Sequence, residues 1–402
     1  MASRLSRKSV EQNSAAEQNS AAGQNSAAEQ NSATGQNSAA GQNSAAEETF
    51  KAHVSFPTKI ALGAAVVLAF FISFMLGKYA MTPAEVVQGV VSYVSKAITF
   101  LWAALQDPSL FTDGSIPITR EERVLFNIRL PRILVVMLVG AALSVAGASY
   151  QGMFKNPLTS PDLLGASAGA SLGACIALLL NLSGESVQLF AFIGGMSAVG
   201  MAVWLNRAVD YDPTLGLVLA GILVGTLFQS GTSLVKFMAD ADDKLPTITF
   251  WLMGSFANVN QRDLLILIFP MIIGFGILLS QAWKLNVLSF GDEEARAMGV
   301  NTRTTRLLVI FASTLITSAS VAVAGIVGWI GLVIPHLARA VVGPNYKVLL
   351  PTAMFVGSVF LLIVDNIARL LATVEIPIGI LTAIIGVPFF VVIFKHNMKG
   401  WR

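Results

Sequence analysis

The chain has 402 residues and a formal net charge of +3; 54% of its residues are hydrophobic and only 12% are charged. Soluble domains carry about twice that share of charged residues, and the apolar residues here form blocks long enough to cross a bilayer as helices. The composition excludes an ordinary soluble protein and predicts an all-α, polytopic membrane protein. The single cysteine, Cys175, excludes an internal disulfide and gives no metal-site pattern.

Residues 1–50 differ from the rest of the chain. Six hexapeptide repeats of the EQNSAA and GQNSAA type run from Glu11 to Ala46. They contain no aromatic or branched aliphatic residue, so they cannot bury enough apolar area to offset the entropy lost on ordering. We expect a disordered cytoplasmic tail, and nothing after its basic start resembles a secretory signal.

Hydropathy predicts ten membrane spans within residues 58–402. Val91–Leu105 is shorter and carries Lys96, so we expect it to form an amphipathic helix at the membrane surface. The ten spans are 58–77, 133–150, 162–181, 189–206, 214–235, 263–282, 305–323, 326–342, 349–371 and 379–395.

The distribution of positive charge predicts the sidedness of these spans. With both termini in the cytoplasm, 16 Lys and Arg residues fall inside and ten outside, six of them in a long first outer loop, 78–132. Arg129, Arg132 and Arg369 then face outward, against the general bias. They are either interfacial anchors or a cationic surface that awaits an acidic partner, and position alone does not decide between the two.

The sequence offers no energy source of its own. It has no GxxxxGK[ST] nucleotide motif and no Ser/His/Asp or HExxH arrangement, so we expect no enzymatic activity, cofactor or metal site. Deep ionisable residues are few, and Asp365 stands four residues before Arg369, which suits a local helical pair. This scarcity argues against an ion-driven secondary carrier, which remains the rival hypothesis, and favours energy supplied by another chain.

Two glycine series predict close helix packing, because small residues let helix backbones approach each other in lipid. The first places Gly165, Gly169 and Gly173 four residues apart. The second places Gly325, Gly328 and Gly331 three apart and is followed by Pro335.

Residues 284–304 form a predicted cytoplasmic loop that contains a short surface helix of two or three turns. Ser289 and Asp292 resemble a capping box, acidic residues fill the first turn, and Gly299 can close the helix in a left-handed conformation. Ala295 and Met298 are expected on one side of it. The helix is either a solvated connector or a segment that docks in a groove of a cytoplasmic partner.

Several motifs together resemble the FecCD/BtuC-like permeases, the membrane subunits of bacterial ABC importers for iron-siderophores and cobalamin. They occur in the family's order and span nearly all of residues 58–402. They are RLPR (129–132), NPLTSPDLLGASAGASLGA (156–174), FWLMGSF (250–256), LSFGDEEARAMGV (288–300), GLVIPHLAR (331–339) and EIPIGILTAIIGVPFF (375–390).

The resemblance implies a ten-helix subunit in the cell membrane that pairs with a second permease, as a homodimer or heterodimer. Two cytoplasmic ATPases would drive it, and an extracytoplasmic binding protein would deliver an iron-siderophore, with cobalamin or haem as alternatives; no nucleic acid is involved. Arg129, Arg132 and Arg369 would receive glutamates of the binding protein. The ATPase would seat the coupling helix, which comprises Gly291, Asp292, Glu293, Glu294, Ala295, Arg296 and Gly299. The repeat tail and the long 78–132 segment depart from the family pattern.

Overall fold

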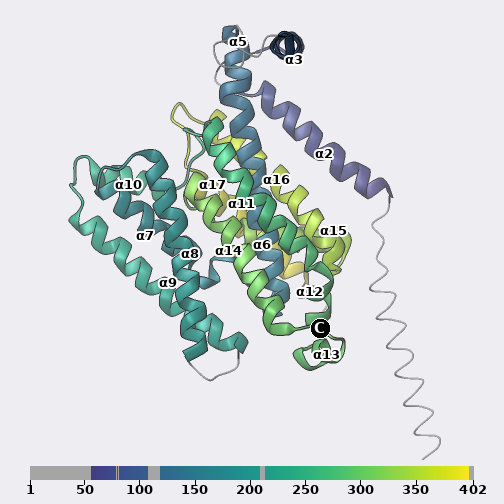
Figure 1. The fold of residues 1–402 in the computed structure, drawn as a ribbon, viewed down its shortest axis with the longest axis vertical. Coiled ribbons are helices and arrows are strands. Elements are labelled where there is room, and N and C mark those ends of the chain that lie inside the picture. Colours follow the sequence, from purple (N-terminus) through teal and green to yellow (C-terminus); the bar gives the residue numbers. More distant parts are fainter. Residues whose placement is uncertain (1–55, 78, 80, 107–117, 209–212, 398–402) are drawn as a thin grey trace, which may run out of the picture. The chain divides into compact units, whose positions relative to one another are not determined.

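The computed structural model describes residues 56–77, 79, 81–106, 118–208 and 213–397. The chain divides into Met1–His53 and Val54–Arg402, so the tail predicted for residues 1–50 lies outside the described residues. Within the described part the regular elements are all helices, which confirms the all-α prediction (Figure 1).

The helices up to the first glycine series are α2 (Phe56–Met75), α3 (Pro83–Gln106), α5 (Arg120–Arg123), the π-helical turn η1 (Val124–Arg129), α6 (Leu130–Phe154), the 3-10 turn η2 (Pro161–Leu164) and α7 (Ala166–Leu179). They are followed by α8 (Gly184–Ala208), α9 (Pro213–Met238), α10 (Lys244–Leu252), α11 (Gln261–Ser280), α12 (Ala282–Leu288) and α13 (Asp292–Ala297). The last four are α14 (Thr302–Ala324), α15 (Ile330–Val342), α16 (Tyr346–Leu370) and α17 (Ile378–Asn397).

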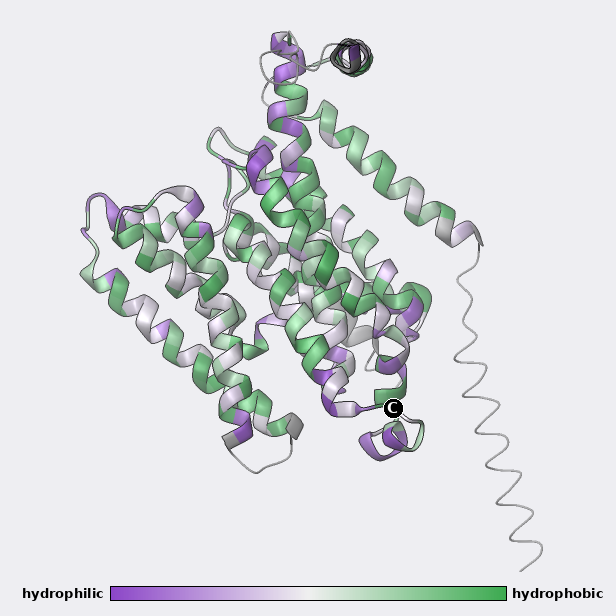
Figure 2. Cartoon of the chain, viewed as in Figure 1, coloured by the Kyte–Doolittle hydropathy of each residue, from purple (hydrophilic) through white to green (hydrophobic). Residues whose placement is uncertain are grey.

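Each of the ten predicted spans overlaps one of these helices. Six helices of the described part are long and apolar enough to cross a membrane: α6 with its N-terminal extension, α8, α9, α11, α14 and α16. The counterparts of the other four spans, in α2, α7, α15 and α17, are shorter apolar helices. The number of ten spans therefore stays a prediction. Figure 2 shows hydrophobic residues along the long helices and hydrophilic residues on α5 and α13.

The predicted outer loop 78–132 is largely helical where it is described, and α3 includes Val91–Leu105, the segment expected to be helical. Residues 83–106 form α3, and the helix that becomes α6 already starts at Arg120. Pro131 has no N–H to donate within a regular helix. The turn just before it is a wider π-turn, in which the Leu130 N–H bonds Leu125 O, and it accommodates the missing donor. Arg129 and Arg132 are three residues apart and so share one face of the helix.

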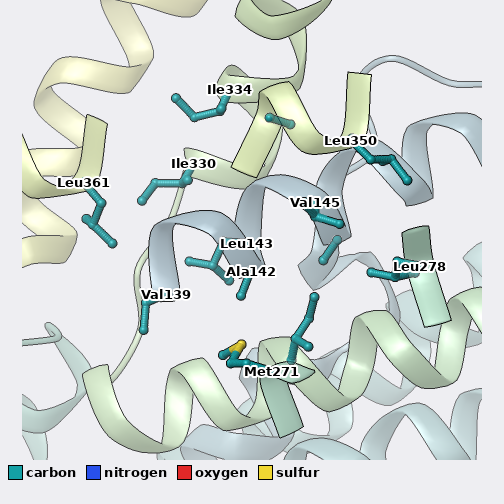
Figure 3. Packing of buried hydrophobic residues seen from close by; sticks show 14 of the residues in the cluster. Val139, Ala142, Leu143, Val145, Met271, Leu278, Ile330, Ile334, Leu350 and Leu361 are labelled. Atoms are coloured by element: carbon teal, nitrogen blue, oxygen red, sulfur yellow. The ribbon is translucent and has the colours of Figure 1, made fainter. Parts of the chain in front are cut away.

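The core lies around α6, and Figure 3 shows apolar side chains from α6, α11, α15 and α16 that pack together. Glycines make this packing close. A Cβ on Gly147 would lie 1.9 Å from Gly331 O, and one on Gly140 would lie 2.3 Å from Gly357 O. These contacts hold α15 and α16 directly against α6. Helix α6 runs from α5 at one end of the bundle toward α12 and α13 at the other (Figure 1).

The first glycine series packs α7 on α8. A Cβ on Gly169 would meet Gly194 O at 2.2 Å, and one on Gly173 would meet Phe190 O at 2.0 Å. Gly165 has a φ of +84° and starts α7 next to Gly225 of α9. The series therefore sets how closely α7, α8 and α9 pack.

The second series behaves differently from the expectation. Gly325 ends α14 with a φ of +69°, and α15 begins only at Ile330, so Gly325 and Gly328 lie in a break and not on a helix face. A Cβ on Gly328 would meet nothing within 4 Å, whereas Gly331 lies against Pro161. The packing interpretation of Gly328 is therefore wrong, because the chain turns at this point before α15 starts. Pro335 lies inside α15.

Candidate functional site

The three arginines singled out from the sequence lie together at the end of the bundle that carries α5. Arg129 and Arg132 come from the start of α6, and Arg369 comes from the last turn of α16. Their exposed fractions are only 4%, 6% and 6%. They form a buried cluster whose partners all belong to this chain.

Arg132 binds two carboxylates at once. Its Nη2 donates to Asp365 Oδ1 at 2.7 Å and to Glu375 Oε2 at 2.8 Å, and its Nη1 donates to Glu375 Oε1 at 3.0 Å. Asp365 is fully buried, whereas the Glu375 side chain is 22% exposed. The guanidinium is therefore anchored from inside by Asp365 and covered on its outer side by Glu375.

Arg369 and Arg129 bind polar atoms of α2 and its C-terminal connection. Arg369 lies 3.1 Å from Asp365 Oδ2, an ion-pair distance without hydrogen-bond geometry, and its Nη2 donates to Ser73 Oγ at 2.9 Å. This bears out the predicted local pair of Asp365 and Arg369. Arg129 donates to the carbonyls of Phe74 and Tyr79, and Gly77 leaves the room for its guanidinium.

This geometry differs from the open cationic surface that the sequence suggested. Both readings of the arginines, anchors or docking cations, assumed that the charges face water or headgroups. In the structure they are enclosed, and the two carboxylates offset much of their charge. An acidic partner of Arg132 must therefore compete with an internal carboxylate, and Glu375 is the more accessible of the two that bind it.

A cavity of about 660 Å³ lies where η2, α7 and α9 meet, and the sequence reasoning named only part of its lining. Polar side chains of α9 recur at helical spacing along it, and hydroxyls of α7 face them. Thr226, Ser233 and Ser171 each donate to the carbonyl four residues earlier in their own helix, at 2.8, 3.1 and 2.7 Å. The polar residues of the lining include Ser167, Ser171, Thr226, Gln229, Ser233 and Lys236.

The signal that could have found the cavity was present in the sequence. Thr226, Gln229, Ser233 and Lys236 follow each other at intervals of three or four residues in an otherwise apolar span, a polar stripe that points to a water-filled path. Lys236, one residue beyond the predicted span 214–235, lies in the last turn of α9. Among the described residues the lining carries one cation, Lys236, and one carboxylate, Asp162, and its other polar groups are hydroxyls and the Gln229 amide.

The third candidate is α13 at the opposite end of α6 from the arginine cluster (Figure 1). It is shorter than expected, six residues, and Gly291 is its N-cap without a side-chain cap. The predicted capping box is wrong, because Ser289 ends α12 and donates to Asn286 O at 2.6 Å. Gly299 does adopt the predicted left-handed conformation, with a φ of +79°.

The surface of α13 is acidic and open. Ala295 is buried, whereas Met298, the C-cap of α13, is 54% exposed. Asp292 binds Arg306 at 2.8 Å and fixes α13 to α14, while Glu293, Glu294 and Arg296 are exposed. Exposed Phe290 and Met298 flank these charges, a mixture suited to docking in a groove.

The comparison with protein families decides the assignment. The model of the FecCD transport family matches residues 65–396. The chain belongs to the FecCD transport family. Its resemblance to these permeases, drawn from the sequence motifs, is confirmed, and as a FecCD member the chain is an ABC importer permease, of a class without its own nucleotide-binding site.

Relatives of this FecCD permease carry different cargoes. The molybdate import system permease MolB of Haemophilus influenzae is 38% identical over 85% of this chain and 97% of its own length. The hemin transport system permease HmuU of Yersinia pestis is 40% identical over 66% of this chain and 80% of its own length. A solved structure described as an inward-facing metal-chelate type ABC transporter is 35% identical, with a TM-score of 0.72 over 85% of this chain and all of that chain.

Proposed function

We propose that this FecCD permease carries an iron-siderophore complex across the cell membrane, through the cavity between η2, α7 and α9. The observation that carries the proposal is the size and lining of that cavity. Its volume of about 660 Å³ falls in the range of roughly 300–1,000 Å³ that holds drug-sized molecules. The hydroxyls of Thr226, Ser233 and Ser171 donate hydrogen bonds to carbonyls of their own helices. They therefore present oxygen lone pairs to the cavity, which would bind a large polar chelate weakly and let it leave.

Molybdate is the second candidate cargo, because MolB is similar over almost its whole length. A small oxyanion is held by convergent N–H donors or positive side chains. Lys236 supplies one such charge to the cavity, and the second permease of a dimer would supply another. Cobalamin and haem remain alternatives on the strength of relatives named for them.

Uptake by the reconstituted transporter separates these cargoes. Proteoliposomes that contain the permease, its ATPase and its binding protein would receive radioactive ferric siderophore, molybdate, cobalamin or haem, each in a separate reaction. We expect ATP-dependent accumulation of the siderophore, abolished by ATP depletion with the membrane potential intact. Accumulation of molybdate alone would overturn the cargo, and transport that persists without ATP would indicate an ion-driven carrier.

We further propose that the arginine cluster, expected on the outer side, receives the binding protein. A glutamate of that protein would take the place of Glu375 on Arg132, while Asp365 holds the guanidinium in position. Arg129 and Arg369 would contribute further positive charge around the exchanged carboxylate. Such charge-assisted contacts fix register and speed association more than they add affinity.

At the opposite end, we propose that residues Gly291–Gly299 seat in one of two cytoplasmic ATPases. The exposed carboxylates of Glu293 and Glu294 and the apolar Phe290 and Met298 would fill the ATPase groove. Nucleotide binding and hydrolysis there would move α13, and the close contacts of α6 would transmit the motion to the arginine end. Two permeases, alike or different, would enclose the central path.

A further inference from the structure

Helix α3 carries three separate faces along its length. The first contacts the protein: Lys96 Nζ donates to the buried carboxylate of Glu122 at 2.9 Å, and the Tyr93 ring stacks on Phe126 with centroids 3.9 Å apart. Gly89 lies on the same face, close to Leu125. These contacts fix the rotation of α3 about its own axis.

The second face is an exposed apolar stripe, opposite the contacts. Its members recur at intervals of three or four residues and are 46–68% exposed: Val87, Val91, Val94, Ile98 and Trp102. At 100° per residue they fall within a sector about 80° wide. None is charged, so this stripe offers nothing to a partner that docks through ion pairs.

The third face is polar and lies beside the apolar stripe. Gln88, Ser95 and Thr99 are exposed on it at helical spacing. A helix that spanned the bilayer would place this whole polar stripe in hydrocarbon. A helix in water would leave the apolar stripe without cover. One face on protein, one apolar and one polar together suit a helix that lies in the membrane interface, in contact with protein, lipid and water at once.

The direction of α3 agrees with this placement. In Figure 1 α3 is seen along its axis, whereas α5 and α6 run in the plane of the picture, so α3 runs crosswise to the central spanning helix. It follows α2 after seven residues, and α2 exposes its own apolar residues Val67, Leu68, Phe71 and Ile72. Exposed apolar residues therefore occur on both helices that flank this short connection.

We propose that α3 lies in the membrane interface at the arginine end of the molecule, with Val87, Val91, Val94, Ile98 and Trp102 inserted among phospholipid acyl chains. Trp102 occupies the kind of interfacial position that tryptophan favours in membrane proteins. Through Lys96–Glu122 and Tyr93–Phe126, α3 ties the helix that bears Arg129 to the bilayer surface. The arginine cluster thereby keeps a fixed height above the lipid. This placement depends neither on the cargo nor on which side of the membrane the end faces.

Spin labels in the full chain test the placement. Cys175 is the single cysteine and is buried, so a Cys175→Ser background allows one label each at Val91 and Ile98 on the apolar stripe and at Ser95 and Thr99 on the polar one. The protein is placed in nanodiscs of phosphatidylcholine and phosphatidylglycerol, and collision rates with O2 and with Ni-EDDA are measured. We expect the ratio of O2 to nickel collisions to be several-fold higher at Val91 and Ile98 than at Ser95 and Thr99.

Two results would overturn the proposal. Equal nickel collisions on both stripes would place α3 in water. Low collision rates with both reagents at Val91 and Ile98 would mean that protein, such as a second copy of the chain, covers the stripe. Quenching by brominated lipid provides an independent readout: the difference in quenching between the wild type and Trp102→Phe should be positive, and no difference would contradict insertion of Trp102.

Discussion

The two ends of α6 present their charged side chains in different ways. At the arginine end, each of the three guanidinium groups already binds groups of this chain, and all three are buried. At the α13 end, one carboxylate, Asp292, is paired, while its acidic neighbours are exposed and free to bind. Under the proposed roles, docking at the first end would exchange Glu375 for a carboxylate of the partner, whereas docking at the second would add contacts without displacing one.

The largest expected effect comes from removing the inner anchor of the arginine end. Asp365→Ala leaves Arg132 and Arg369 buried without their shared carboxylate, and breaking a buried pair in this way costs roughly 3–5 kcal/mol. We expect a marked fall in the unfolding temperature of the detergent-solubilised permease, followed by size-exclusion chromatography after heating. An unfolding temperature equal to the wild-type value would show that the cluster is not the closed network described here.

The comparison also assumes a rigid connection between the ends. Gly331→Ala would push a methyl group to 2.3 Å from Pro161 and part α15 from its neighbours, at a cost of about 1–3 kcal/mol. Gly328→Ala, three residues earlier, meets nothing and serves as the matched control. We expect the first variant to lose thermal stability and ATP-coupled transport and the second to retain both. Equal behaviour of the two would argue against close packing as the source of rigidity.

A smaller effect is expected at the open end. Reversing two exposed charges, Glu293→Lys with Glu294→Lys, should weaken the permease–ATPase complex by roughly 0.5–2 kcal/mol without unfolding the permease. Co-purification of the ATPase at increasing salt measures this loss. Glu185→Lys, an exposed position on α8, is the control and should leave the complex unchanged. Undiminished co-purification of the double variant would remove α13 from the interface.

The smallest change in stability, and the most specific, is expected from a variant that tests the exchange of Glu375 for a glutamate of the binding protein on Arg132. Glu375→Gln removes a partly exposed carboxylate, so stability should fall by about 1 kcal/mol or less. Association of the binding protein should become faster, because the neutral amide introduced by this substitution binds Arg132 less strongly than the Glu375 carboxylate and is displaced more easily. Surface plasmon resonance of the binding protein on immobilised permease would show this, with Arg132→Gln as the opposite case. Slower association of the Glu375→Gln variant would mean that Glu375 builds the docking site rather than covers it.

The sequence predicted the helices better than the contacts. Hydrophobic blocks placed a helix at each of ten positions, since the apolar length required by a bilayer is a local property. The pairing of Asp365 with Arg369 followed from their spacing. The bonds from Arg132 to Asp365 and Glu375 could not be predicted in this way, because they join residues more than 230 positions apart.

Errors of the sequence reasoning arose where local patterns competed. Ser289 has the spacing of a capping residue for α13, but it closes α12 instead. Gly328 has the spacing of a packing residue, but it lies in the non-helical segment between α14 and α15. Backbone turns of this kind depend on neighbouring helices, which a single sequence does not display.

The central claim is that the arginine end and the α13 end face opposite sides of the membrane, and site-directed labelling tests it directly. In a Cys175→Ser background, Val374→Cys provides an exposed thiol next to Glu375, and Glu293→Cys provides one on α13. With a membrane-impermeant maleimide added to intact spheroplasts, we expect Val374→Cys to react at once and Glu293→Cys to react only after permeabilisation. Reaction of both thiols from the same side would contradict the sidedness on which the proposed docking and coupling roles depend.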